Sequence, residues 1–231
     1  MNKKHGLWLL VCLSLVLGGI FTGGCDNGEQ KKAESVVQEE TAGLIVAVGD
    51  SLTAGLGLDE AQAFPALLAE RLKKDGRNYQ VVNSGVSGET SSGTLSRIDW
   101  ILTMKPDIVI LETGANDGLR GQDVELLQKN LEKILRKLQQ ADVEVVLTGM
   151  LMVWNLGEDY TSAFNMVYPD VAEKFDYPFM EFFLQDVATV AELNLDDGLH
   201  PNHEGYKRIV ENLYPHVIVA IDRLEKKRNS R

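Results

Sequence analysis

The sequence contains very little cysteine: Cys12 and Cys25 are the two cysteines of a 231-residue chain, and both lie within its first 25 positions. The part of the chain that has the composition of a folded domain therefore has none. This excludes a disulfide framework in that part, and it excludes a cysteine nucleophile. Histidine is also scarce, with four residues, so few side chains are suited to act as a general base near neutral pH.

The chain also lacks an excess of basic residues and a long membrane-spanning run. Lys and Arg number 23 against 34 Asp and Glu, giving a formal net charge of −11. Such a surface repels nucleic acid and anionic lipid, so neither is expected as a direct partner. The uncharged run from Gly6 to Phe21 is shorter than the roughly 20 residues that a helix needs to span a bilayer.

The first 25 residues, MNKKHGLWLLVCLSLVLGGIFTGGC, have the layout of an export signal. Two lysines precede an apolar core from Leu7 to Leu17, and small residues follow it. The string TGGC resembles the lipobox of bacterial lipoproteins, in which the cysteine is lipidated. The resemblance implies a signal peptide over residues 1–24, a lipidated Cys25, and export to a membrane surface facing the periplasm or the cell exterior. A plain signal peptide or an uncleaved anchor is the alternative.

Beyond the signal peptide, the chain divides into a tether and one domain. Residues 25–43 are polar and charged, and are predicted to be a flexible tether. Over residues 44–231, short apolar runs alternate with longer amphipathic segments. The runs are 44–48, 79–83, 107–113, 143–149 and 177–183. Nearly unbroken aliphatic runs are typical of parallel strands covered on both faces, so the pattern predicts an α/β fold with a doubly wound, five-stranded parallel sheet.

One amphipathic segment, DVELLQKNLEKILRKLQQ, is strongly marked as a helix. Asp123 is its predicted N-cap. The predicted apolar stripe consists of Leu126, Leu127, Leu131, Ile134, Leu135 and Leu138.

Small and polar residues follow four of the five predicted strands, where ligand sites gather in doubly wound sheets. The first such loop, within VAVGDSLTAGLG (46–57), offers Ser51 as a nucleophile, although Asp50 or Ser51 could instead cap a short helix. A phosphate-binding loop is not indicated, because the Gly-Lys-Ser/Thr ending is missing. The elbow G-x-S-x-G of α/β-hydrolases is not indicated either, since Thr53 replaces its second glycine.

A serine nucleophile needs a base, and His200 and His203 are the histidines that lie in a predicted strand-end loop. In the string DGLHPN, Asp197 precedes His200 by three residues, so one turn can bring its carboxylate to Nδ1 while Nε2 faces outward. Two alternatives are open. Asp197 could cap the last helix, or Asp196, Asp197, His200 and His203 could bind a metal.

Taken in order, VGDSLTAG, VNSGVSGET, ETGANDGLRG and DDGLHPN resemble the four sequence blocks of the SGNH (GDSL) hydrolases. The last two strings resemble most closely the bacterial thioesterase I, lysophospholipase L1 and arylesterase subgroup. The resemblance spans residues 44 to about 220. It implies a flavodoxin-like, three-layer α/β/α sandwich and a serine esterase that needs no metal and no cofactor.

The resemblance assigns three catalytic roles: Ser51 is the nucleophile, His200 the general base and acid, and Asp197 the orienting carboxylate. The implied substrate is a small acyl ester or thioester, or a lysophospholipid, hydrolysed by a monomer that contacts the membrane through its N-terminal lipid. A carbohydrate O-deacetylase with the same triad, a non-catalytic ligand-binding lipoprotein and a metal-dependent hydrolase are the alternatives.

The resemblance also assigns the donors of an oxyanion hole, which are the backbone N–H groups of Ser51 and Gly88 and the side-chain amide of Asn116. Asp50 is expected to support the turn. The variable loop MLMVWNLGEDY is expected to shape the acyl site, with its methionines and Trp154 either lining that site or packing in the core.

Overall fold

The computed structural model describes residues 41–152 and 156–230 of the chain. The signal peptide predicted over 1–24, the lipidation predicted at Cys25, most of the tether predicted over 25–43, and Trp154 lie outside the described residues. They stay predictions; the mass of the mature N-terminal peptide would test the first two. In the part of the chain that is described, no helix combines the length and the apolar character that crossing a membrane requires.

Five parallel strands form one sheet in the order β2-β1-β3-β4-β5. The strands are β1 (Gly43–Gly49), β2 (Tyr79–Gly85), β3 (Ile108–Leu111), β4 (Glu144–Thr148) and β5 (Phe179–Met180). This is the strand order of flavodoxin-like folds, and it confirms the predicted fold class. Each predicted run overlaps a strand, but the last run yields only two strand residues, which pair with Leu147 and Thr148 of β4.

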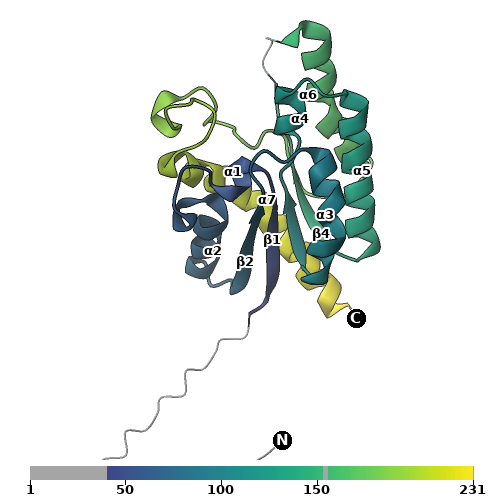
Figure 1. Ribbon diagram of the computed structural model, residues 1–231. Coiled ribbons are helices and arrows are strands. Elements are labelled where there is room, and N and C mark those ends of the chain that lie inside the picture. Colours follow the sequence, from purple (N-terminus) through teal and green to yellow (C-terminus); the bar gives the residue numbers. More distant parts are fainter. Residues whose placement is uncertain (1–40, 153–155, 231) are drawn as a thin grey trace, which may run out of the picture. The chain divides into compact units, whose positions relative to one another are not determined.

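Helices cover the two faces of the sheet, as Figure 1 shows. They are α1 (Ser51–Ala54), α2 (Phe64–Lys74), α3 (Ser91–Thr103), α4 (Ala115–Leu119), α5 (Val124–Gln140), α6 (Glu158–Ala172) and α7 (His203–Asn229). Helices α2 and α7 pack together on one side, and α3, α5 and α6 form the layer on the other. All residues of β3 are completely buried between these layers, which explains the unbroken aliphatic sequence of that strand.

Helix α5 confirms most of its predicted pattern. Asp123 is its N-cap, because the side chain accepts a hydrogen bond from the Glu125 N–H at 2.9 Å. The stripe was wrong at one position: Leu126 is 41% exposed, whereas Leu127 is completely buried. Successive residues of a helix are about 100° apart, so Leu126 lies to one side of the face that meets the sheet. Asn130, which the predicted stripe did not include, is a buried residue of α5.

Candidate active site

The turn after β1 places Ser51 at the carboxyl end of that strand, where α1 packs against β1 and β2. Asp50 caps the four-residue helix α1, and its Oδ1 accepts a hydrogen bond from the Leu52 N–H at 2.9 Å. Ser51 is the first residue of that helix and lines the cavity described below. The capping interpretation therefore applies to Asp50, and it leaves the Ser51 hydroxyl available for other contacts.

A continuous line of hydrogen bonds joins Ser51 to the loop that precedes α7. Ser51 Oγ lies 2.9 Å from His200 Nε2, and His200 Nδ1 lies 2.6 Å from Asp197 Oδ2. When Nδ1–H donates to the carboxylate, Nε2 is free to accept the serine proton. The structure thus brings together the three residues that the sequence named, although they span 150 positions of the chain.

The Asp197 carboxylate is held in its charged form by local donors. Its Oδ1 accepts hydrogen bonds from the N–H groups of His200, at 3.0 Å, and of Leu199, at 2.9 Å. These bonds, and that to the imidazole, lower the pKa of Asp197 to about 2. The proposed role as cap of the last helix was wrong, because Asn202 caps α7 by accepting from the Gly205 N–H at 3.1 Å.

The metal-site alternative finds no support in the geometry. Within residues 41–152 and 156–230, no group of three or more His, Cys, Asp or Glu side chains is placed to hold a metal ion. His203 is the first residue of α7, and His200 faces Ser51 instead.

The predicted oxyanion donors line the same cavity as Ser51 and His200. Gly88 belongs to a turn closed by the Glu89 N–H, which donates to the Val86 carbonyl at 3.0 Å. Its φ of +79° is a conformation that favours glycine. Among the described residues, no hydrogen-bond acceptor contacts the backbone N–H of Ser51 or of Gly88, so both donors are available to a substrate oxygen.

Asn116, the third predicted donor, is the second residue of α4. Its Nδ2 group donates to Asp50 Oδ2 and to the Glu89 carbonyl, each at 3.0 Å. Both amide hydrogens therefore have acceptors within the chain. Donation to a substrate oxygen requires Asn116 to share or exchange one of these bonds.

The cavity has a volume of about 620 Å³ and a largely apolar wall. Met150 and Met152 both line it, and Met150 is also part of the buried core, so the two roles considered for these methionines are not exclusive. Four of the lining residues are leucines that are 44–56% exposed: Leu56, Leu119, Leu151 and Leu199. Because they both line the cavity and face solvent, they form its mouth; we call them the leucine rim.

Sequence reasoning missed a buried carboxyl group beneath the nucleophile turn. Glu112 is completely buried, and its Oε2 accepts hydrogen bonds from the Asp50 N–H at 3.2 Å and the Thr53 hydroxyl at 2.8 Å. Its Oε1 has no partner among the described residues. Burial, and then the nearby Asp50 carboxylate, raise the pKa of Glu112 well above its ordinary value. The sequence feature that could have indicated this buried carboxyl is the position of an acidic residue directly after an aliphatic strand.

We expect the Glu112→Gln variant to gain stability relative to the wild type as pH rises. Because the folded-state pKa is raised, the wild type loses stability as pH increases from about 4.3, the ordinary value, toward the folded-state value. Glutamine has the shape of the protonated acid and cannot ionise. The difference in free energy of unfolding should shift in favour of the variant by at least about 1 kcal/mol between pH 5 and pH 9.

Urea unfolding at the two pH values measures this difference. Glu125→Gln on the exposed face of α5 is the matched control, which reports the effect of removing one negative charge from the surface. An unchanged difference between Glu112→Gln and the wild type at the two pH values would contradict a neutral Glu112.

Comparisons with known proteins identify the family to which this fold belongs. Residues 47–208 match the family described as GDSL-like lipase/acylhydrolase. Esterase TesA of Pseudomonas aeruginosa is 39% identical over 181 residues, which are 78% of this chain and 90% of that protein. The arylesterase of Vibrio mimicus is 36% identical over 72% of this chain and 84% of its own length. The crystal structure of the psychrotrophic esterase EstA from a Pseudoalteromonas species, inhibited by monoethylphosphonate, has a TM-score of 0.74 at 31% identity, covering 78% of this chain and 99% of that one.

Proposed function

Since the chain belongs to the GDSL-like lipase/acylhydrolase family, we propose that it hydrolyses carboxylic esters or thioesters with Ser51, His200 and Asp197 as its catalytic triad. The observation that carries this proposal is the line of hydrogen bonds from Asp197 through His200 to Ser51, which ends in an apolar cavity. The esterase and arylesterase among the similar proteins support the same class of reaction.

In the proposed mechanism, the Ser51 oxygen attacks the acyl carbon while His200 Nε2 takes the hydroxyl proton. The charged Asp197 carboxylate stabilises the imidazolium that forms. The negative charge that develops on the former carbonyl oxygen is stabilised by the N–H groups of Ser51 and Gly88 and by the Asn116 amide.

Collapse of this intermediate breaks the bond to the leaving alcohol or thiol, which takes the proton from His200. The acyl group stays on Ser51 as an ester. Water then attacks the acyl carbon, with His200 again as the base, and a second collapse releases the carboxylic acid and restores the serine hydroxyl.

The wall of the cavity favours an apolar acyl chain as the group that it binds. Beyond the polar residues near Ser51, the lining includes Met150, Met152, Phe182 and Leu184. Burial of a methylene group against such a wall contributes about 0.8 kcal/mol. A sugar would need hydrogen-bond partners there instead, so we place an acyl ester or lysophospholipid ahead of an acetylated carbohydrate.

Hydrolysis of a panel of substrates tests the proposed function: acetyl to dodecanoyl p-nitrophenyl esters, an acyl thioester, a lysophospholipid and an acetylated sugar, each with and without EDTA. We expect ester hydrolysis that increases with acyl length and is unaffected by EDTA. Hydrolysis of the acetylated sugar alone would favour the deacetylase alternative. No hydrolysis by the folded protein would favour the non-catalytic one.

The leucine rim gives a sharper test of the acyl site. We expect Leu151→Ser to lower kcat/KM for an octanoyl ester about 10-fold and to leave the acetyl ester within about twofold, because we expect the longer chain alone to extend from Ser51 to the rim. Leu126→Ser is the matched control, since Leu126 is similarly exposed but lies on α5, outside the lining of the cavity. Equal losses for both esters would contradict acyl binding at the rim.

A further inference from the structure

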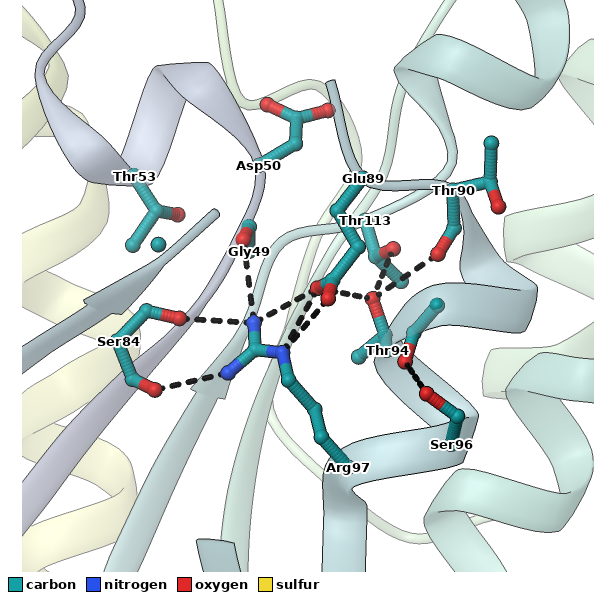
Figure 2. Close-up of polar contacts among 12 residues, drawn as sticks. Gly49, Asp50, Thr53, Ser84, Glu89, Thr90, Thr94, Ser96, Arg97 and Thr113 are labelled. Carbon is teal, nitrogen blue, oxygen red and sulfur yellow. Dashed lines mark hydrogen bonds and ion pairs between the residues drawn. The ribbon is translucent and has the colours of Figure 1, made fainter. Parts of the chain in front are cut away.

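One arginine joins three segments of the chain near the carboxyl ends of β1 and β2 (Figure 2). Arg97, on α3, donates from Nε to Glu89 Oε1 and from Nη2 to Glu89 Oε2, each at 2.7 Å. Its Nη2 group also lies 2.8 Å from the Ser84 carbonyl oxygen and 3.3 Å from that of Gly49. The same guanidinium therefore links the ends of β1 and β2 to the turn formed by residues 86–89.

The Arg97–Glu89 pair is largely buried, with side-chain exposures of 16% and 8%. The Thr94 hydroxyl adds a hydrogen bond to Glu89 Oε2 at 3.0 Å. Removing two charges from water is costly, and apolar residues of similar volume are often at least as stabilising as a buried ion pair. Stability alone therefore gives a weak reason for such a pair, and its planar, forked geometry suggests a role in fixing positions.

Glu89 connects this pair to the oxyanion donors. Its side chain contacts Arg97, while its backbone carbonyl accepts from the Asn116 amide at 3.0 Å. Gly88, the preceding residue, has its carbonyl bound by Arg120 at 2.8 Å, and the Val86 N–H at the start of the turn donates to Gly49 at 2.9 Å. The turn of residues 86–89 is thus held at its start by Gly49, at Gly88 by Arg120 and at its end by Arg97.

We propose that Arg97 and Glu89 are a positioning pair that fixes the Gly88 N–H and the Asn116 amide relative to Ser51. They contact no reacting atom and act through the turn that they hold. This role rests on the proposed function, because it presumes that Gly88 and Asn116 donate to the oxyanion. Such donors act only over hydrogen-bond distances, so a small shift of the turn affects the transition state more than the bound substrate.

The test uses Arg97→Lys and Glu89→Gln in the full chain, with p-nitrophenyl butyrate as substrate at a temperature well below the Tm of every variant. Lysine keeps the charge but loses the forked geometry, and glutamine keeps the shape but loses the charge. We expect each variant to lower kcat about 10-fold and to leave KM within about twofold. The shape of the pH profile of kcat/KM should not change, because the contacts of His200 are untouched.

A rescue experiment separates positioning from general loss of structure. We expect methylguanidinium to restore part of the kcat of Arg97→Ala, and methylammonium to restore none, because only the former has the planar fork. Arg77→Lys is the matched control: this partly exposed arginine pairs with Asp222 at 3.2 Å, and its replacement should leave kcat unchanged.

Three results would overturn the positioning role. They are values of kcat within twofold of the wild type in both Arg97→Lys and Glu89→Gln, a rise in KM that accounts for the whole loss, or loss of the fold in both variants. A wild-type chain that is folded but hydrolyses none of the panel esters would instead overturn the proposed function, so the two failures are distinguishable.

Discussion

Replacement of Ser51 by alanine is expected to lower kcat for ester hydrolysis by at least about 1,000-fold, while the protein stays folded. The hydroxyl is the atom that forms the acyl-enzyme, and no other group in the line from Asp197 through His200 can replace it. Removing one oxygen from a small, buried side chain changes little in the packing of α1. Steady-state kinetics with an octanoyl ester, together with the Tm, measure both effects.

Ser162→Ala is the matched control, because Ser162 is an exposed serine of α6 that lies outside the lining of the cavity. Its kcat should stay within about twofold of the wild type, as expected of a substitution outside the reacting groups. A Ser51→Ala variant that retains a tenth of the wild-type kcat would show that another group is the nucleophile.

Replacement of Asn116 by alanine is expected to lower kcat about 100- to 1,000-fold and to change KM by less than about threefold. An oxyanion donor bonds most strongly to the charge that develops in the transition state, so its loss affects kcat rather than substrate binding. The amide also holds Asp50 and the Glu89 carbonyl, and both contacts are lost together.

Asn116→Asp is the informative comparison for this prediction. It keeps the size of the side chain but replaces the donor by an acceptor, so it should be no more active than Asn116→Ala. A large rise in KM with little change in kcat would instead assign Asn116 to substrate binding, and would contradict its place in the oxyanion hole.

The fold was predictable because its strongest signals are local. The strands β1 and β3 are buried on both faces, and such strands need nearly continuous aliphatic sequence. The boundaries were less predictable at β5, of which only two residues pair with β4. The exposed Leu126 shows a similar limit, because the face of a helix that meets the sheet depends on packing as well as on periodicity.

The candidate site was predictable only as a set of loops. Asp197 and His200 are close in sequence, and their spacing indicated a turn that permits the contact now seen at 2.6 Å. Whether Asp197 oriented the histidine or capped α7 could not be decided from spacing, since both need a carboxylate in the same turn. The structure distinguishes the two roles, because Asn202 is the N-cap of α7.

The tertiary contacts of Arg97, Glu89 and Glu112 were not predictable from the sequence. Arg97 and Glu89 read as ordinary members of an amphipathic helix and a polar loop, and the contacts of Arg97 with Gly49 and Ser84 form only because β1 and β2 lie side by side. Glu112 follows an aliphatic strand directly, which is a local signal of burial, but its hydrogen bonds with Asp50 and Thr53 form only in the fold. Such contacts depend on tertiary distances that no local pattern encodes.

The most direct test of the central claim is the site of covalent labelling by a fluorophosphonate probe, mapped by mass spectrometry of the digested protein. The proposed triad predicts one adduct, on Ser51, that forms equally fast with and without EDTA and far more slowly in His200→Ala. The Ser51→Ala variant should remain unlabelled. An adduct on another residue, or a folded wild-type protein that hydrolyses esters but takes up no probe at Ser51, would contradict the proposed triad.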